Sequence, residues 1–309
     1  MRFWESYHYY KHYFGFVNAI KLSVVPRILG RIFRKDFYVP AVLKYQYKDS
    51  IDVIDKYKND TSAILNGDVP DIIWVCWWQG KDQMPEVIAK CYNSLLRNAN
   101  GRKVILIEKA NYNQYALIPQ YIIEKMKQGK ISFSHFSDIL RVTLLKTHGG
   151  MWVDAALFVT KPIPKFSDFF MPRMRPYGSF CQGKWCFGVM SGPKNHQIFS
   201  YMQDCLLGYW HRHDAVVDYL MFDGLLRLGY ENVETIRQTI DALEVSSPDL
   251  HTSRYSFNEE LDRAHFDKLI ANNNFLSLTW RMKYSEKTED GATTFYGALI
   301  NTPPGLNKF

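Results

Sequence analysis

The chain of 309 residues is long enough for one large domain or two small ones, since single cores stop growing near roughly 250–300 residues. Hydrophobic residues make up 47%, aromatic residues 16% and charged residues 22%, which excludes a wholly disordered chain. No uncharged apolar run reaches the roughly 20 residues of a spanning helix. His, Tyr and Lys interrupt residues 1–19, unlike a secretory signal, so we expect a cytoplasmic protein.

The net charge of +7 is concentrated at the N-terminus, where residues 1–50 carry nine Lys and Arg against three acids. The same stretch is dense in Trp, Tyr and Phe, which suit the boundary between headgroups and acyl chains. We therefore expect residues 1–60 to form short helices, broken near Pro26 and Pro40, with a charged segment following at about 49–60. Their predicted partner is an anionic membrane, at the inner face of the plasma membrane.

Two features exclude other classes of protein. Beyond the N-terminus the chain is close to neutral and lacks the spacing of a nucleic-acid reader, so no nucleic-acid partner is expected. The odd number of cysteines suits reduced thiols in the cytoplasm, and the Cys181 and Cys186 pair has no second pair to complete a zinc site.

After residue 60 the pattern becomes that of an α/β domain. We expect a strand at 71–78, a helix at 85–98 and a strand at 102–109, which form a βαβ unit with a mostly parallel sheet covered on both faces. A helix at 119–128 follows. A helix that begins near residue 136 then ends at Gly149 and Gly150, and a strand at 151–160 follows directly. Further helices are expected near 196–210 and 215–228 after a strand-like, turn-rich stretch.

The helix before the glycines carries Asp138 and Arg141, which are three residues apart and so share one face. They could form a simple ion pair, but the apolar helix and the glycine turn bring them toward the carboxyl end of the next strand, where open α/β sheets bind ligands. Asp154 lies on that strand among apolar residues, and an ionised carboxylate there needs a cation or several donors. We expect Asp154 to meet a ligand; a structural role, as a cap or a partner of Arg141, is the alternative.

The segment "SDILRVTLLKTHGGMWVDAALFVTKP" resembles the S-D-x-x-R and G-G-x-W/Y-x-D-x-D/T motifs of one group of glycosyltransferases. The group includes capsular polysaccharide synthesis proteins, the yeast initiating mannosyltransferase and the glucosylating clostridial toxins. "DIIWVCWWQG" resembles the first strand of the same family, and weaker likeness continues through "VVDYLMFDGLL" and "LTWR". The resemblance implies a GT-A-type fold over residues 61–309, with the N-terminal helices as an appendage.

The resemblance also implies a role for each matching residue. Trp77 would lie against the uracil of a UDP-sugar, with Gln79 and Gly80 alongside. Asp138 and Arg141 would grip the donor sugar and its phosphate, which suits the need of sugars and pyrophosphate for polar clamps and positive charge. Asp154 corresponds to the first acid of D-x-D and would contact ribose and a divalent metal.

One position departs from the family pattern, because Ala156 replaces the second acid of D-x-D. A Mn²⁺ or Mg²⁺ ion can still be held by Asp154 together with phosphate oxygens and water. If no metal binds, Arg281 and Lys283 are the expected substitutes over the pyrophosphate; the alternative for them is a solvated basic patch.

A second pair of acids, Asp218 and Asp223, fits either acceptor-hydroxyl binding or helix capping. We include Asp223 with Asp138, Arg141 and Asp154 among the candidate catalytic residues. The side chains of Trp185, Trp210 and His196 could line an acceptor groove, although core packing is the alternative for each.

Together these features predict a membrane-peripheral, retaining hexosyltransferase that moves a sugar from a UDP-sugar to a lipid-linked saccharide in capsular or other surface polysaccharide synthesis. The alternative is a catalytically degenerate protein that holds a nucleotide-sugar at the membrane, suggested by Ala156. A dehydrogenase is disfavoured because no G-x-G-x-x-G follows the first strand.

Overall fold

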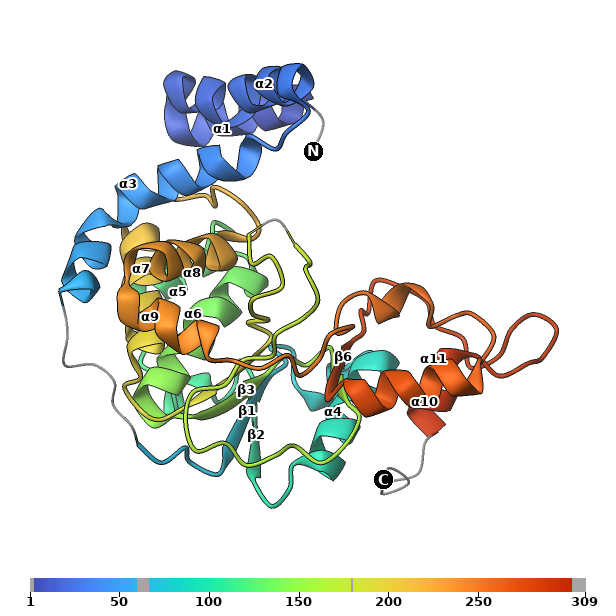
Figure 1. Ribbon diagram of the computed structural model, residues 1–309. Helices are drawn as coiled ribbons and strands as arrows, with labels where there is room; N and C mark the ends of the chain where they lie inside the picture. The colour runs from blue at the N-terminus through green and yellow to red at the C-terminus, as the bar shows by residue number, and fades with distance from the viewer. Residues whose placement is uncertain (1–2, 60–66, 179, 302–309) are drawn as a thin grey trace.

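The structure is a computed structural model that describes residues 3–59, 67–178 and 180–301 (Figure 1). Its central sheet has the strand order β2-β1-β3-β5. The strands are β1 (Ile72–Cys76), β2 (Lys103–Ile107), β3 (Gly150–Val153) and β5 (Val189–Gly192). β1 runs parallel to β2 and β3, and only β5 is antiparallel, against β3. The predicted mostly parallel α/β sheet with flanking helices is confirmed.

The helices around the sheet are α4 (Glu86–Asn98), α5 (Gln120–Lys127), α6 (Phe133–His148), α7 (Gln197–Arg212), α8 (Met221–Asn232) and α9 (Glu234–Asp241). Four of them, α4 to α7, begin and end close to the predicted residues, α8 begins later than predicted, and α9 was not predicted. The Ser132 side chain accepts a hydrogen bond from the His135 backbone N–H and so caps the first turn of α6. The helix predicted at 215–228 begins later, at Met221, because the Asp218 carboxylate accepts from the Leu220 backbone N–H and holds the preceding residues in a turn.

The two glycines between α6 and β3 allow the chain to turn directly into the sheet. Both have positive φ, 69° at Gly149 and 90° at Gly150. A Cβ atom at Gly150 would lie 2.7 Å from the carbonyl oxygen of Ile72 on β1, so only glycine permits this approach of the two strands. The turn brings the polar face of α6 to the carboxyl end of β3.

The strand predicted at 151–160 is wrong in one respect, because it is two strands. β3 ends at Val153, the chain turns at Asp154 with a hydrogen bond from the Leu157 N–H to the Asp154 carbonyl, and β4 (Leu157–Val159) then joins a different sheet. Its partner is the antiparallel strand β6 (Phe275–Ser277). The β4–β6 sheet lies between two cores: Leu157, Val159 and Phe275 belong to the main core, and Phe158 and Leu276 to a second one. Asp154 thus lies after β3 rather than within a strand.

The C-terminal part of the chain forms a second core around β4 and β6. Helices α10 (Arg263–Asn272) and α11 (Phe295–Asn301) cover it, at one side of the molecule in Figure 1. The side chains of Trp77 and Ala156 pack against the edge of this second core. The boundary between the two cores therefore runs past the end of β3.

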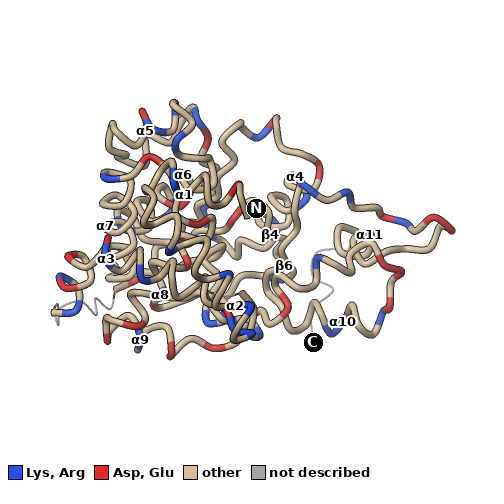
Figure 2. Tube along the Cα trace, turned by 90° about the horizontal axis from the view of Figure 1, so that it is seen from above, with Lys and Arg blue, Asp and Glu red and all other residues tan. Residues whose placement is uncertain are grey.

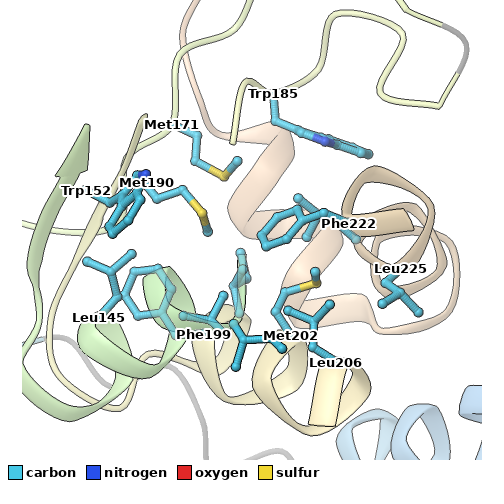
Figure 3. Packing of buried hydrophobic residues seen from close by; sticks show 14 of the residues in the cluster. Leu145, Trp152, Met171, Trp185, Met190, Phe199, Met202, Leu206, Phe222 and Leu225 are labelled. Carbon is cyan, nitrogen blue, oxygen red and sulfur yellow. The ribbon is translucent and has the colours of Figure 1, made fainter. Parts of the chain in front are cut away.

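The main core lies between the sheet and helices α6, α7 and α8, as Figure 3 shows. Trp152 of β3 and Leu145 of α6 lie toward one side of it, and Phe199 and Met202 of α7 lie beneath Phe222 of α8. Burial of each such side chain contributes about 1.5–3 kcal/mol relative to an exposed one. This packing gives the polar residues of α6 and α8 a rigid base.

The N-terminal helices are α1 (Phe3–Ala19), α2 (Val25–Phe33) and α3 (Tyr38–Lys58), and residues 20–24 form a π-helical turn between the first two. Pro26 and Pro40 each stand in the first turn of a helix, where a missing N–H costs little. The charged segment expected at 49–60 is wrong as a separate segment, because α3 continues to Lys58 and packs on α7 and α8. The expected division at residue 60 lies outside the described residues, so it stays a prediction.

Within the described part of the chain, no helix combines the length and the apolar character needed to cross a lipid bilayer.

Candidate functional site

The candidate site lies where β1 and β3 end side by side. Cys76 is the last residue of β1, and Asp154 directly follows β3. The two strands are paired in parallel, with Trp74 opposite Trp152, so their ends converge, and burial together with the negative charge of nearby Asp154 raises the pKa of the Cys76 thiol to about 12. Carboxyl ends of parallel strands are the usual ligand sites of open α/β sheets.

Arg141 is the centre of the site. Its side chain is only 2% exposed, and its Nη2 atom lies 2.9 Å from Oδ1 of Asp154. The guanidinium carbon lies 5.0 Å from the ring centre of Trp152, 4.9 Å from that of Phe187 and 5.5 Å from that of Phe222. Rings at these distances attract a cation and restrict its rotation. The predicted charged residue of α6 is thus held in one orientation, toward the end of β3.

The carboxylate of Asp154 is more accessible than the sequence suggested. We expected an acid enclosed by apolar residues on a strand, but the side chain is 36% exposed because the chain turns away after β3. Its Oδ1 accepts hydrogen bonds from Arg141 and from the Trp152 indole at 2.6 Å. A Cβ atom on residue 188 would lie 3.0 Å from Oδ2, so Gly188 keeps the second oxygen uncrowded. That oxygen can meet a ligand.

Two further carboxyl groups lie around the same guanidinium. Asp138 Oδ1 lies 3.5 Å from Arg141 Nη1, and Asp223, in the first turn of α8, accepts a hydrogen bond from the Trp185 indole at 2.8 Å. Burial raises the pKa of Asp138 to about 7 despite the attraction of Arg141, and it raises the pKa of Asp223 to about 7 as well. One guanidinium cannot compensate three buried or half-buried carboxylates. The two aspartic acids therefore gain or lose protons near neutral pH.

Arg141 also has N–H donors that make no hydrogen bond to the described part of the chain. Among the described residues, neither its Nε nor its Nη1 makes a hydrogen bond, although both are buried, and Nη1 has only the ion-pair contact with Asp138 at 3.5 Å. A buried polar group without a partner costs roughly 1–3 kcal/mol, and such groups in native structures call for a bound partner. The arrangement of donors suits an anionic or hydroxylated ligand.

The residues predicted to hold the nucleotide follow β1 at the same end of the sheet. The backbone N–H of Trp77 donates to the Ile107 carbonyl at 3.0 Å, and its indole donates to the Gln83 carbonyl at 3.2 Å. Gln79 is exposed, and Gly80 adopts φ of 94°, which glycine tolerates. The fold thus brings Trp77 to the same edge of the sheet as Asp154. Their roles toward a nucleotide stay predictions.

Arg281 and Lys283 lie in the C-terminal part of the molecule and are exposed. The Arg281 guanidinium lies 5.5 Å from the ring centre of Trp280, and the Lys283 carbonyl accepts from the Asn258 amide at 2.9 Å. The chain that leads to them starts beside the site, because the Leu278 N–H donates to the Ala156 carbonyl. Within residues 3–59, 67–178 and 180–301, neither side chain makes an ion pair, so closure over a pyrophosphate stays a prediction.

The second pair of acids is divided by the fold. Asp218 lies before α8 and accepts from the Tyr38 hydroxyl at 2.6 Å, whereas Asp223 faces the Arg141 region. The aromatic residues proposed for an acceptor groove are buried. The Trp185 indole donates a hydrogen bond to Asp223, and His196 caps α7 by accepting one from the Ile198 N–H. Core packing is therefore their observed role.

Residues 251–254 contribute groups that the sequence did not reveal. The Cys186 thiol lies 3.6 Å from Nε2 of His251, and a Cβ atom on Gly188 would lie 3.5 Å from the same sulfur, next to Asp154. Among the described residues, no partner reaches the buried Nδ1 of His251 or the buried Nε of Arg254. Burial lowers the pKa of His251 to about 4, so its ring is neutral at pH 7. No short motif could have indicated these residues, because only the tertiary fold brings them toward Asp154.

The described residues offer limited support for a metal ion. They contain no group of three or more His, Cys, Asp or Glu side chains arranged to hold one. Asp154 Oδ2 is the available oxygen at the expected position, since Oδ1 is already bonded and residue 156 is alanine. A cation fits here only if a ligand supplies most of its oxygens, as Mg²⁺ commonly accepts from phosphates and water.

A buried guanidinium among carboxyl groups, at the carboxyl end of a mostly parallel sheet, defines an α/β protein with a polar small-molecule site. Residues 26–299 match the family described as capsular polysaccharide synthesis protein, and the chain belongs to that family. The family predicted from the motifs is confirmed.

Two further proteins are similar to this chain. "Uncharacterized glycosyltransferase L373" of Acanthamoeba polyphaga mimivirus is 26% identical over 139 residues, which are 43% of this chain and 54% of the relative. The chain thus matches about half the length of this curated relative. The solved structure of "PaToxG Glycosyltransferase" is 14% identical, with a TM-score of 0.39, covering 77% of this chain and 96% of that one. The name of the viral relative agrees with the predicted enzyme class.

Proposed function

We propose that the protein is a retaining glycosyltransferase that transfers a hexose from a UDP-sugar to a lipid-linked saccharide in capsular or other surface polysaccharide synthesis. Membership of the capsular polysaccharide synthesis family and the name of the viral relative support the class of enzyme. The observation that carries the proposal is buried Arg141 at the carboxyl end of β3, whose Nε and Nη1 make no hydrogen bond within the described residues.

Each group of the site has a task in this proposal. Arg141 donates to the sugar-phosphate region, and Asp138 exchanges hydrogen bonds with sugar hydroxyls. Trp77 lies against the uracil, with Gln79 and Gly80 beside it, and Asp154 contacts the ribose. Preorganised donors in a site that excludes water stabilise charge that develops as the bond to UDP breaks.

The proposed transfer needs no nucleophile from the protein. An acceptor hydroxyl forms the new bond to the anomeric carbon on the face from which UDP departs, so the configuration is retained. The bond between that carbon and the phosphate oxygen breaks, and the hydroxyl proton passes to the departing diphosphate. Asp138 and Asp223, with pKa values of about 7, stand where hydroxyl groups would be oriented.

A divalent cation is part of the proposal and Asp154 is the residue that would hold it. When bound, Mn²⁺ or Mg²⁺ would neutralise charge on the leaving diphosphate. Arg281 and Lys283 are the proposed alternative source of positive charge. Their position after β6, close to the Ala156 turn, is compatible with this role.

We also propose that the enzyme works at the inner face of the plasma membrane. Large apolar side chains of α1 and α2 are exposed, among them Trp4, Ile32 and Phe33. Figure 2 shows Lys and Arg residues gathered along α2. Apolar and basic side chains on one helical surface suit attachment to an anionic bilayer.

A panel of UDP-hexoses, incubated with the purified protein with and without Mn²⁺, tests the enzyme class directly. We expect hydrolysis of one UDP-sugar, measured as released UDP, and transfer when a lipid-linked saccharide is added. If the protein releases UDP from none of the UDP-sugars in the panel, the proposed donor is wrong.

The second candidate is a binding protein that holds a nucleotide-sugar without turnover. Ala156 favours it, because the family's second metal-binding acid is missing. Calorimetry with UDP, together with the UDP-release assay, separates the two candidates. Tight binding of UDP without cleavage of any UDP-sugar, at any Mn²⁺ concentration, identifies the binding protein.

A further inference from the structure

The N-terminal helices enclose a pocket of about 610 Å³ that is separate from the Arg141 site. Its charged lining residues are Arg27, Arg31, Lys35 and Asp36. Arg27 already lies over the Phe3 ring, 5.0 Å from its centre, and the remaining bases, Arg31 and Lys35, still outnumber Asp36. The chemistry that complements this lining is an anion of the size of a phosphate group.

A buried hydroxyl in the pocket points to a ligand independently of the charges. Ser23 lines the pocket, is only 2% exposed, and its Oγ finds no hydrogen-bond partner among the described residues. It stands in the π-helical turn at residues 20–24, and such turns inside helices often mark functional sites. A phosphate oxygen would satisfy this hydroxyl.

The outer surface of α2 places apolar side chains next to the basic ones. Ile28 and Ile32 are 52% and 64% exposed, and they are one helical turn apart. Arg27 and Arg31 precede them by one residue each and follow the same spacing on the neighbouring stripe. An apolar stripe beside a basic pocket fits a lipid whose headgroup enters the pocket while its chains stay in the bilayer.

The pocket is also connected to the Arg141 site. Tyr10 and Tyr38 line it, and their hydroxyls donate to the Val217 carbonyl at 3.0 Å and to Asp218 Oδ2 at 2.6 Å. Val217 and Asp218 lie in the turn before α8, whose first turn carries Asp223. A lipid held in the pocket would thus lie one loop away from the catalytic candidates.

We propose that this pocket binds the phosphate group of an anionic membrane lipid. The inference rests on the membrane part of the proposed function and adds the headgroup chemistry and the residues that recognise it. Two lipids share that chemistry: a bulk anionic phospholipid, and the phosphorylated lipid carrier of the saccharide acceptor.

The first test compares two double variants of the full-length protein in sedimentation with phosphatidylglycerol vesicles. Arg31→Gln with Lys35→Gln removes two charges from the pocket, and Lys11→Gln with Arg34→Gln removes two charges from residues that do not line it. We expect at least a tenfold weaker affinity for the first and about twofold for the second. Equal losses of affinity in the two variants would contradict lipid binding in the pocket, because a diffuse surface potential responds to charge wherever it lies.

Ser23→Ala gives a second test that does not alter charge. Because the hydroxyl is unpaired, its removal should leave the free energy of unfolding unchanged or slightly higher, while the affinity for phosphatidylglycerol vesicles falls several-fold. Unchanged vesicle affinity would remove Ser23 and its hydrogen bond from the proposal.

Vesicles of equal surface charge that contain a polyprenyl phosphate distinguish the two sources. Tighter binding to them supports the acceptor carrier, and equal binding supports bulk phospholipid. UDP-sugar hydrolysis without vesicles, measured on the same variants, should match that of the unmodified protein. If the unmodified protein hydrolyses no UDP-sugar, the proposed enzymatic function is wrong, but the vesicle measurements still test the lipid-binding pocket.

Discussion

The Arg141 site and the N-terminal pocket both use arginine, but in opposite surroundings. Arg141 is withdrawn from water, lies between aromatic rings and is fixed by Asp154 at 2.9 Å. Arg31 and Lys35 stand at the surface, where water and salt screen them. A desolvated charge requires specific partners and so depends on exact geometry, whereas each of several exposed charges that line one pocket contributes only part of the binding. We expect single substitutions to be severe in the first region and graded in the second.

The largest effect is expected for Asp154→Asn. Asparagine keeps the size of the side chain and an oxygen for Trp152 and Arg141, but it removes the charge that we assign to ribose and cation binding. UDP-sugar cleavage should fall below detection while far-UV circular dichroism is unchanged. Turnover near that of the unmodified protein would remove Asp154 from the mechanism and restrict it to orienting Arg141.

Arg141→Lys should lower kcat/KM for the donor by about 10²-fold, since lysine keeps the charge but not the planar set of donors. The matched control is Arg102→Lys, another buried arginine, whose donors reach the carbonyls of Ile163 and Pro164 away from the site. The control should lose stability without a comparable loss of donor use. Equal kcat/KM in the two variants would return Arg141 to a structural role.

A smaller effect is expected for the exposed apolar residues of α2. Ile28→Ser with Ile32→Ser should weaken binding to anionic vesicles about tenfold, because apolar area that enters the bilayer contributes to attachment. Leu117→Ser with Val245→Ser, two exposed apolar residues outside the N-terminal helices that are 94% and 60% exposed, should leave binding unchanged. Donor hydrolysis in solution should be the same for all. Loss of binding in both pairs would mean that α2 has no special place in attachment.

The smallest effect concerns the pH dependence of stability. The pKa of Asp138 is raised by burial from 3.8 to about 7, so the folded state binds more protons than the unfolded state between these values. Its contribution to the free energy of unfolding is fully present below pH 4 and is lost as pH rises through 7. Asp138→Asn should flatten this fall in urea titrations across pH 4–8. Asp223, whose pKa is also raised to about 7, should maintain part of the slope.

Much of the fold was predictable from local patterns. The apolar runs at residues 72–76 and 103–107, with the amphipathic helix between them, define a βαβ unit whatever surrounds it. Gly149 and Gly150 marked the turn that brings α6 to β3. The spacing of Asp138 and Arg141, followed by Asp154, indicated the site, because side chains one helical turn apart share a face.

Only the tertiary structure decided the break after Val153, since a run of apolar residues does not reveal which of two sheets it joins. It also decided that Arg141 is shared by Asp138 and Asp154, with Asp223 near enough to interact, and that His251 lies near Cys186. Asp223, Cys186 and His251 are far from Arg141 in the chain, so no local period relates them to it. The sequence thus determined which residues carry charge, whereas burial and long-range packing decided which donor and acceptor atoms of those residues lack a hydrogen bond within the described chain and can meet a ligand.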